Sequence, residues 1–204
     1  MTALLAISAP AHPGSEKIAC IDGERANTDS GQNELAWIRA AQAGSSEAAE
    51  ALFRRHWRPA YRAAYLVVRD AHAAEDIVQE AFLAALRALD RFDRRRPFGP
   101  WLHRIVVNRA IDWSRARALR REVGVSSEPE RAGPASADDR YSDDVTSALG
   151  ALPPEQRAVV VLRYVLGYTP GEIAKLLGTP RGTVNSRLRR GLDRLADELG
   201  EQER

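Results

Sequence analysis

The sequence predicts an all-α fold in which two small helical domains are joined by a flexible acidic linker. Apolar residues recur at spacings of three and four in both halves of the chain, as they do in amphipathic helices. A segment rich in proline, glycine and serine separates the two halves. The only β-prone run, Val159–Leu162, is flanked by residues at helical spacing, so no strand is needed.

Length and composition fit this division. The chain has 204 residues, of which 44% are hydrophobic and 28% charged, which is enough for one large core or two small ones. We divide it into an N-terminal tail without regular structure at 1–32, a first domain at 33–121, a linker at 122–142 and a second domain at 143–204.

Composition also argues against several kinds of site. Cys20 is the only cysteine, and the four histidines are scattered without ligand spacing, so we expect no disulfide, no metal site and no cofactor. No apolar run approaches the roughly 20 residues that span a bilayer. We therefore expect a cytoplasmic protein that does not insert into a membrane.

The first domain is predicted to contain four helices. A short helix begins near Glu34 and ends at Gly44, and a longer helix with a buried stripe follows it. Asp70 is suited to cap a third helix at about 71–89, because its side chain can accept a hydrogen bond from a free backbone amide. After an Arg-rich loop, a fourth helix begins around Pro100, since proline fits the first turn of a helix.

The second domain is predicted to contain four more helices, at about 143–152, 154–164, 169–177 and 180–199. A Pro-Pro pair separates the first two of them. The last two are joined by a very short turn, which is the pattern of a helix-turn-helix.

The turn and the helix after it support that pattern. Gly178 can adopt the left-handed conformation that ends one helix, and Thr179 can cap the next. Val184 and Leu188 face inward at i and i+4, which leaves an Arg-rich outer face suited to a DNA major groove. A plain helical hairpin with a charged outer face is the alternative. Gly191 lies inside the same helix, costs roughly 1 kcal/mol relative to alanine, and has no functional explanation in the sequence.

Charge is distributed in blocks, although the net charge is only +2. Residues 87–121 contain eleven arginines and three aspartates, a local charge of +8. Residues 122–144 contain seven acids and two arginines, and residues 181–194 contain five arginines and one aspartate. This order indicates two polyanion-binding surfaces joined by an acidic segment. From composition alone, solvated helix faces are an equally good interpretation.

Four short runs in the second domain occur in a fixed order: LPPEQR at 152–157, LRY at 162–164, EIA at 172–174 and GTVNSRL at 182–188. Together they resemble region four of the extracytoplasmic-function (ECF) sigma factors of bacterial RNA polymerase, which reads the −35 promoter element. The resemblance implies that Glu172 and Arg187 form an internal polar pair. It assigns contacts with −35 DNA to Arg163, Gly182, Thr183, Asn185, Ser186, Arg189 and Arg190.

The predicted third helix carries polar residues beside an apolar stripe that includes Leu86. Asp76, Gln79 and Glu80 lie on one face at i, i+3 and i+4, which from spacing alone is typical of a solvated surface. The segment AEDIVQEAF at 74–82 resembles region two of sigma factors, where it docks on the coiled coil of the polymerase β′ subunit. The resemblance assigns polymerase binding to Asp76, Gln79, Glu80 and Leu83.

The predicted fourth helix interleaves aromatic residues with arginines. This mixture suits single-stranded DNA, because rings stack on bases while charges follow the phosphates, although Trp101 by itself is typical of a core. The segment resembles the part of region two that recognises and melts the −10 element, and the preceding loop resembles the one that holds a flipped base. The resemblance assigns −10 DNA contacts to Arg94, Arg95, Arg96, Phe98, Arg104, Asn108, Arg109 and Arg115.

These resemblances imply a sigma factor that directs polymerase to promoters, recognises the −35 and −10 elements, melts DNA and is not itself an enzyme. The expected partners are the polymerase core, through its β′ coiled coil and β flap, promoter DNA, and an anti-sigma factor. An autonomous helix-turn-helix regulator is an alternative that explains only the second domain. A helical nuclease is a further alternative, but the acids do not cluster at a spacing that metal-assisted hydrolysis needs.

Overall fold

The structure, a computed structural model, describes residues 33–122 and 143–202, and all regular structure within those ranges is helical. The all-α prediction is confirmed. The described residues from Trp37 onward belong to one compact unit. The expected tail at 1–32 lies outside the described residues, as does the expected linker except for its first residue, which ends a helix. Within the described ranges, no helix combines the length and the apolar character that crossing a membrane requires.

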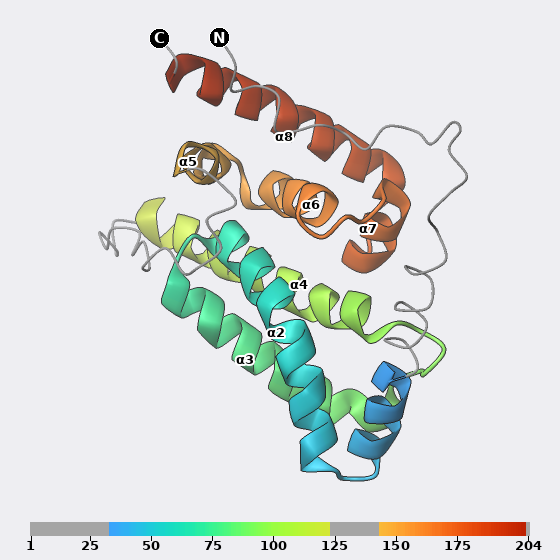
Figure 1. Cartoon of the computed structure of the whole chain (residues 1–204). Coiled ribbons are helices and arrows are strands. Elements are labelled where there is room, and N and C mark those ends of the chain that lie inside the picture. Colours follow the sequence, from blue (N-terminus) through green and yellow to red (C-terminus); the bar gives the residue numbers. More distant parts are fainter. Residues whose placement is uncertain (1–32, 123–142, 203–204) are drawn as a thin grey trace, which may run out of the picture. The chain divides into compact units, whose positions relative to one another are not determined.

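The helices follow the predicted order (Figure 1). After a helix at 33–42, the first helical group consists of α2 (Ser46–Val68), α3 (Ala71–Ala88), the 3-10 turn η2 (Leu89–Arg91) and α4 (Phe98–Glu122). The second helical group consists of α5 (Asp143–Ala151), α6 (Pro154–Tyr164), α7 (Pro170–Leu177) and α8 (Arg181–Gln202).

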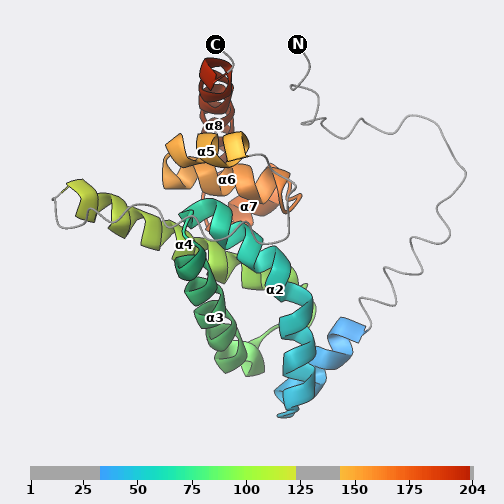
Figure 2. The same ribbon diagram turned by 60° about the vertical axis from the view of Figure 1, so that its left-hand side comes forward.

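Small side chains let the helices of the first group approach each other closely. Ala60, Ala63 and Ala64 on α2 are fully buried, as are Ala81 and Ala85 on α3. Helix α2 packs against both α3 and α4, and the three lie side by side in Figures 1 and 2. Because alanine loses no side-chain entropy on burial, this close contact is formed at little entropic cost.

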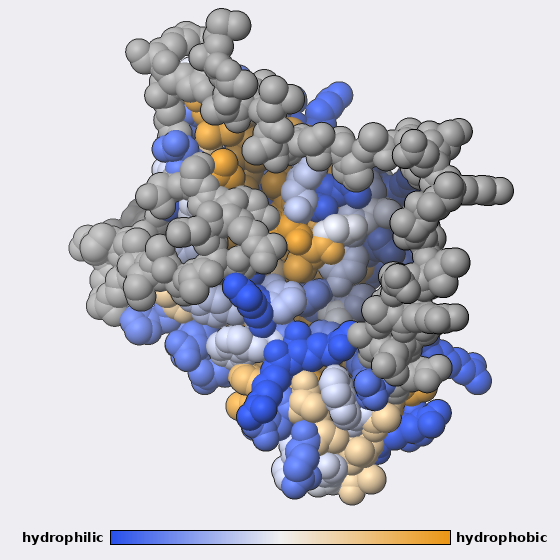
Figure 3. All heavy atoms as spheres, in the orientation of Figure 1, coloured by the Kyte–Doolittle hydropathy of each residue, from blue (hydrophilic) through white to orange (hydrophobic). Residues whose placement is uncertain are grey.

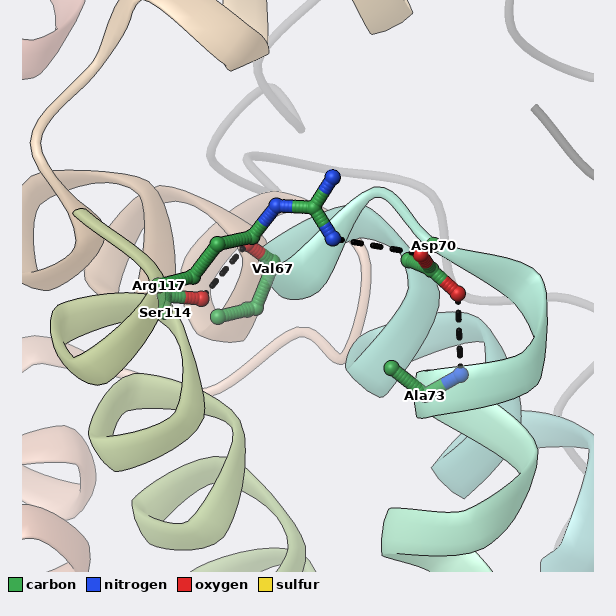
Figure 4. Close-up of polar contacts among 5 residues, drawn as sticks. All are labelled: Val67, Asp70, Ala73, Ser114 and Arg117. Atoms are coloured by element: carbon green, nitrogen blue, oxygen red, sulfur yellow. Dashed lines mark hydrogen bonds and ion pairs between the residues drawn. The ribbon is translucent and has the colours of Figure 1, made fainter. Parts of the chain in front are cut away.

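Asp70 fixes the corner between α2 and α3 (Figure 4). Its Oδ1 accepts a hydrogen bond from the Ala73 amide at 3.0 Å, which confirms the predicted cap. Its Oδ2 accepts from Nη1 of Arg117 on α4 at 3.2 Å, and both side chains are mostly buried. Ser114, also on α4, donates to the Val67 carbonyl at 3.4 Å. The first helical group is therefore locked at one corner by polar contacts from all three helices.

The turn of the helix-turn-helix differs from the prediction at one residue. Gly178 has a φ of 65°, so its predicted left-handed conformation is confirmed. However, α8 begins at Arg181, and the Pro180 carbonyl accepts the first helical hydrogen bond, from the Val184 amide. Thr179 is therefore one residue too early to cap α8, and its hydroxyl has no hydrogen-bond partner among the described residues.

Helix α7 begins with a capping box instead. The Thr169 hydroxyl accepts from the Glu172 amide, and the Glu172 carboxylate accepts from the Thr169 amide at 2.8 Å. The Thr169 backbone and hydroxyl lower the pKa of Glu172 below its ordinary value. The expected Glu172–Arg187 pair is wrong, because Glu172 serves as the cap while the charge of Arg187 helps to lower the pKa of Glu155.

Close packing accounts for Gly191. A Cβ at this position would lie 3.1 Å from Cγ2 of Val160 and 3.7 Å from the Cβ of Gln156, both on α6. Helices α6 and α8 therefore approach each other at Gly191, and the glycine has a structural role that local sequence did not reveal.

The two helical groups also contact each other within the compact unit. Helix α6 packs against α2 and α4, and α7 packs against α4 (Figures 1 and 2). A single cluster of buried apolar residues includes members of both groups, among them Val67, Leu102 and Val161.

Candidate functional site

Helix α3 presents an exposed face that combines acidic and apolar side chains. Asp76, Gln79, Glu80 and Leu83 are all exposed, with Leu83 at 52%. Leu86 was predicted to be buried, but it is 38% exposed because it lies one turn beyond Leu83 on the same side. We call these five residues the α3 surface. Figure 3 shows mostly hydrophilic side chains over α2 and α3 on the face it presents, with smaller apolar areas between them.

An ion pair connects the α3 surface to α4. Oε2 of Glu80 lies 2.6 Å from Nη1 of Arg109, and the two side chains are 65% and 40% exposed. An ion pair this exposed contributes at most about 1 kcal/mol to folding stability. Either side chain can therefore leave this pair and bind a charged group of a partner molecule at low cost. A groove between α3 and α4 is lined by both residues together with Asp76 and Trp113. The structure thus joins a residue predicted to bind polymerase to one predicted to bind DNA.

The loop before α4 presents three arginines to solvent. Arg94, Arg95 and Arg96 are all exposed. The Arg94 side chain donates to Oε1 of Gln42 at 2.6 Å, and the Arg95 amide donates to the Asp93 carboxylate at 3.0 Å. These local bonds shape the loop while leaving a dense positive charge on its surface.

Phe98 lies in the core, whereas it was predicted to lie in this loop. Helix α4 begins at Phe98 and not near Pro100, and the ring is 1% exposed. Its centroid lies 5.1 Å from that of His56, 5.8 Å from Phe92 and 5.5 Å from Trp101. The predicted contact between Phe98 and DNA stays a prediction, and it requires this aromatic cluster to open.

The outer side of α4 carries the remaining polar candidates. Arg104, Asn108 and Arg115 share one side of the helix at i, i+4 and i+11, while Arg109 lies on the side that meets α3. Arg115 is paired with Glu155 on α6, with 2.6 Å between Nε and Oε1. We call Arg104, Asn108, Arg109, Arg115 and the loop arginines the α4 surface.

A buried histidine lies next to that surface and was not predicted to have a role. His103 is 7% exposed, and its Nδ1 lies 2.7 Å from the hydroxyl of Tyr168, which follows α6. Burial, with a smaller contribution from His56, lowers the pKa of His103 to about 4, so the ring is neutral at pH 7. Burial also raises the pKa of Tyr168. No local pattern pairs residues 65 positions apart, so sequence reasoning could not have found this contact.

Helix α8 presents its polar residues on the side opposite its buried ones. Val184 is fully buried, whereas Gly182, Asn185 and Arg189 are exposed at i, i+3 and i+7. Thr183, Ser186 and Arg190 form the adjacent row, in which Arg190 donates to the Ser186 carbonyl at 3.2 Å. We call these two rows, Gly182, Thr183, Asn185, Ser186, Arg189 and Arg190, the α8 surface.

Arg163 lies on α6 and so belongs to neither of the α8 rows. Its side chain is half-buried, donates to the Tyr168 carbonyl at 3.3 Å and lies 6.0 Å from the centre of the Tyr164 ring. Among residues 33–122 and 143–202, no group of three or more histidine, cysteine or acidic side chains is placed to hold a metal ion.

Comparisons with known proteins match both helical groups. The family profile "Sigma-70 region 2" matches residues 52–120, and "Sigma-70, region 4" matches residues 142–195. The ECF RNA polymerase sigma factor SigM of Mycobacterium tuberculosis is 38% identical over 163 residues, which cover 80% of this chain and 83% of SigM.

Two solved structures resemble this fold. CnrH in complex with the cytosolic domain of CnrY has 30% identity and a TM-score of 0.62, with coverage of 83% of this chain and 98% of CnrH. The sigma factor RpoE in complex with the anti-sigma factor NepR from Bartonella quintana has 26% identity and a TM-score of 0.57, with coverage of 85% and 98%.

Proposed function

Because this chain belongs to the ECF RNA polymerase sigma factors and so directs polymerase to initiate transcription at promoters, we propose that its three exposed surfaces divide that task. The α3 surface binds the polymerase core, the α4 surface binds the −10 element, and the α8 surface with Arg163 binds the −35 element. The domain boundaries proposed at 33–121 and 143–204 separate the first two surfaces from the third.

The observation that carries this assignment is the composition of the α3 surface. Two exposed leucines beside Asp76 and Glu80 fit a protein partner, because apolar side chains exposed on one helix face gain free energy when a partner covers them. The α4 and α8 surfaces instead combine arginines with asparagine, serine and threonine, which contact phosphates and base edges.

We further propose that the chain catalyses no reaction itself and acts in the cytoplasm, where the polymerase supplies the chemistry. RpoE was solved with an anti-sigma factor, and this supports a similar partner for the present chain. The β flap of the polymerase is the proposed contact of the second helical group.

Association with core polymerase tests the α3 assignment. Leu83→Asp places a charge on the α3 surface and should weaken binding about tenfold or more, because a buried aspartate has no partner there. Leu119→Asp is the matched control, since Leu119 is 61% exposed near the end of α4 and lies outside the three surfaces. Equal binding by both variants in gel filtration with core enzyme would contradict the assignment, and wild-type chain that neither binds core nor starts transcription would contradict the function.

A further inference from the structure

Arg157 on α6 is a buried guanidinium that joins the two helical groups. It is 7% exposed, and its Nη1 donates to the Val67 carbonyl of α2 at 2.7 Å. Its Nη2 donates to the carbonyls of Gly150 and Leu152, at 2.7 and 2.8 Å. One side chain therefore binds main-chain oxygens from both groups.

The end of α2 is suited to receive that charge. Val67 is the second-last residue of α2, and the last four carbonyls of a helix have no partner within the helix. These carbonyls also carry the negative end of the helix dipole, which favours a cation. A second cross-group contact lies beside the first, because Arg69 at the end of α2 donates to the Thr146 carbonyl of α5. Two arginine–carbonyl contacts thus connect the end of α2 to the second helical group.

The same docking covers part of the α4 surface. Glu155, two residues before Arg157, holds the Arg115 guanidinium at 2.6 Å. Although burial alone would raise its pKa, its own backbone amide and Arg115 hold the pKa of Glu155 below the ordinary value, so the carboxylate is charged at neutral pH. Tyr168 contacts His103, which lies five residues before Asn108 on α4. An arginine paired to a carboxylate cannot direct the same Nε at a phosphate.

We propose that the second helical group is an intramolecular mask of the α4 surface, with Arg157 as its latch and Glu155 as the group that competes with DNA for Arg115. This proposal rests on the function assigned above to the α4 surface. In the free chain the latch is closed, and DNA or polymerase has to displace the Glu155–Arg115 pair before the α4 surface can bind fully.

Binding to a fluorescein-labelled oligo(dT) strand tests the competition in the full-length chain, because phosphate contacts do not depend on base sequence. Glu155→Gln should bind about threefold to fivefold tighter than wild type, the size of one partly exposed ion pair. Asp112→Asn is the matched control, since Asp112 lies 3.6 Å from Arg115 but on the same helix. It removes the same charge without opening the latch, so an equal gain by both variants would overturn the mask.

Energy transfer between two dyes tests the closure itself. The labels are attached to cysteines at Arg87 on α3 and Arg194 on α8, both exposed, in a Cys20→Ser background. Energy transfer should be lower in Glu155→Gln than in wild type, and lower still in Arg157→Lys. Lysine has a single ammonium group in place of the planar guanidinium that donates to three carbonyls in the wild-type chain. Asp112→Asn should keep the wild-type value. Unchanged energy transfer in both Glu155→Gln and Arg157→Lys would overturn the proposal. Glu155→Gln provides the test even if Arg157→Lys does not fold.

An Arg115→Ala background separates this proposal from the assigned function. If the mask is correct, the gain from Glu155→Gln disappears when Arg115 is absent. If the gain persists, the mask is wrong while the chain still initiates transcription. If Arg115→Ala alone changes neither oligo(dT) binding nor transcription, the failure lies in the assignment of Arg115 to the α4 surface.

Discussion

Arg115 and Arg157 carry the same charge in different surroundings, and this separates a binding role from a structural one. The Arg115 side chain is 54% exposed, so losing its pair with Glu155 costs little folding free energy. Arg157 is almost fully buried, and truncating it would take the donor from the Gly150 and Leu152 carbonyls, each costing about 1–3 kcal/mol, while Ser114 still donates to the Val67 carbonyl. Substitutions at exposed arginines therefore report on function, whereas substitutions at Arg157 also report on stability.

His103 should make folding stability depend on pH. Its pKa is lowered from 6.5 to about 4 in the folded chain, so the unfolded chain binds more protons between these values. The free energy of unfolding should fall by about 2 kcal/mol when the pH drops from 7 to 5. Urea unfolding across this range measures it, and His103→Gln should flatten the dependence. His72→Gln is the control, because His72 is exposed on α3, and an identical pH dependence in all three chains would disprove the role of His103.

Two glycines in α8 should respond in opposite directions to alanine. At Gly200 a Cβ meets nothing within 4 Å, so Gly200→Ala should stabilise the chain by up to about 1 kcal/mol through helix propensity. At Gly191 the Cβ would press on Val160, a stiff and buried side chain, so Gly191→Ala should destabilise by about 1 kcal/mol. Thermal unfolding of both variants measures the difference. Stabilisation by Gly191→Ala would mean that α6 and α8 are not closely packed there.

At the scale of helices, periodicity and capping residues predicted most of the fold. Asp70 caps α3, Gly178 ends α7, and Val184 with Leu188 faces inward, all as expected. These features depend on residues within one or two turns of each other, so the local sequence contains them. The start of α8 was misplaced, because Thr179 and Pro180 both fit a helix start and only the packed turn decides between them.

The two threonines near α7 provide a test of that distinction. Thr169→Ala removes the hydroxyl that accepts from the Glu172 amide and donates to the Glu172 carboxylate, and should cost about 1 kcal/mol of unfolding free energy, a large share for a helix of 8 residues. Thr179→Ala should be close to neutral, because the Thr179 hydroxyl makes no hydrogen bond among the described residues. Urea unfolding of the two variants measures the costs. The reverse order would restore Thr179 as the cap of α8.

The candidate surfaces were predictable to different degrees for the same physical reason. The α8 surface follows from helix periodicity, and the structure places all six of its residues on the outer side of α8. Phe98 was misplaced because its burial depends on a ring contact with His56, far away in the sequence, and Leu86 was misplaced because it shares the exposed side of α3 with Leu83. The pairing of Arg115 with Glu155 joins two helices on opposite sides of the expected linker, so no local pattern contains it.

At the scale of the whole molecule, two separate DNA surfaces have to act together. Each surface alone offers few contacts, and the −10 contacts require melted DNA, which costs several kcal/mol of base stacking. The free chain should therefore bind promoter duplex weakly, whereas the complex with core polymerase binds tightly and specifically. Fluorescence anisotropy with a labelled promoter duplex compares the two. Nanomolar, sequence-specific binding by the free chain would contradict the requirement for polymerase.

The proposed function requires the α4 and α8 surfaces to read two different promoter elements. Start sites mapped on genomic fragments transcribed in vitro by core polymerase test it directly, with wild-type chain, Asn108→Ala and Asn185→Ala compared in parallel. Asn185→Ala should relax base preference only in the upstream element, and Asn108→Ala only in the downstream element, because each asparagine lies on a different surface. A change in the same element by both variants, or start sites that share no pair of elements, would contradict the assignment of one promoter element to each surface.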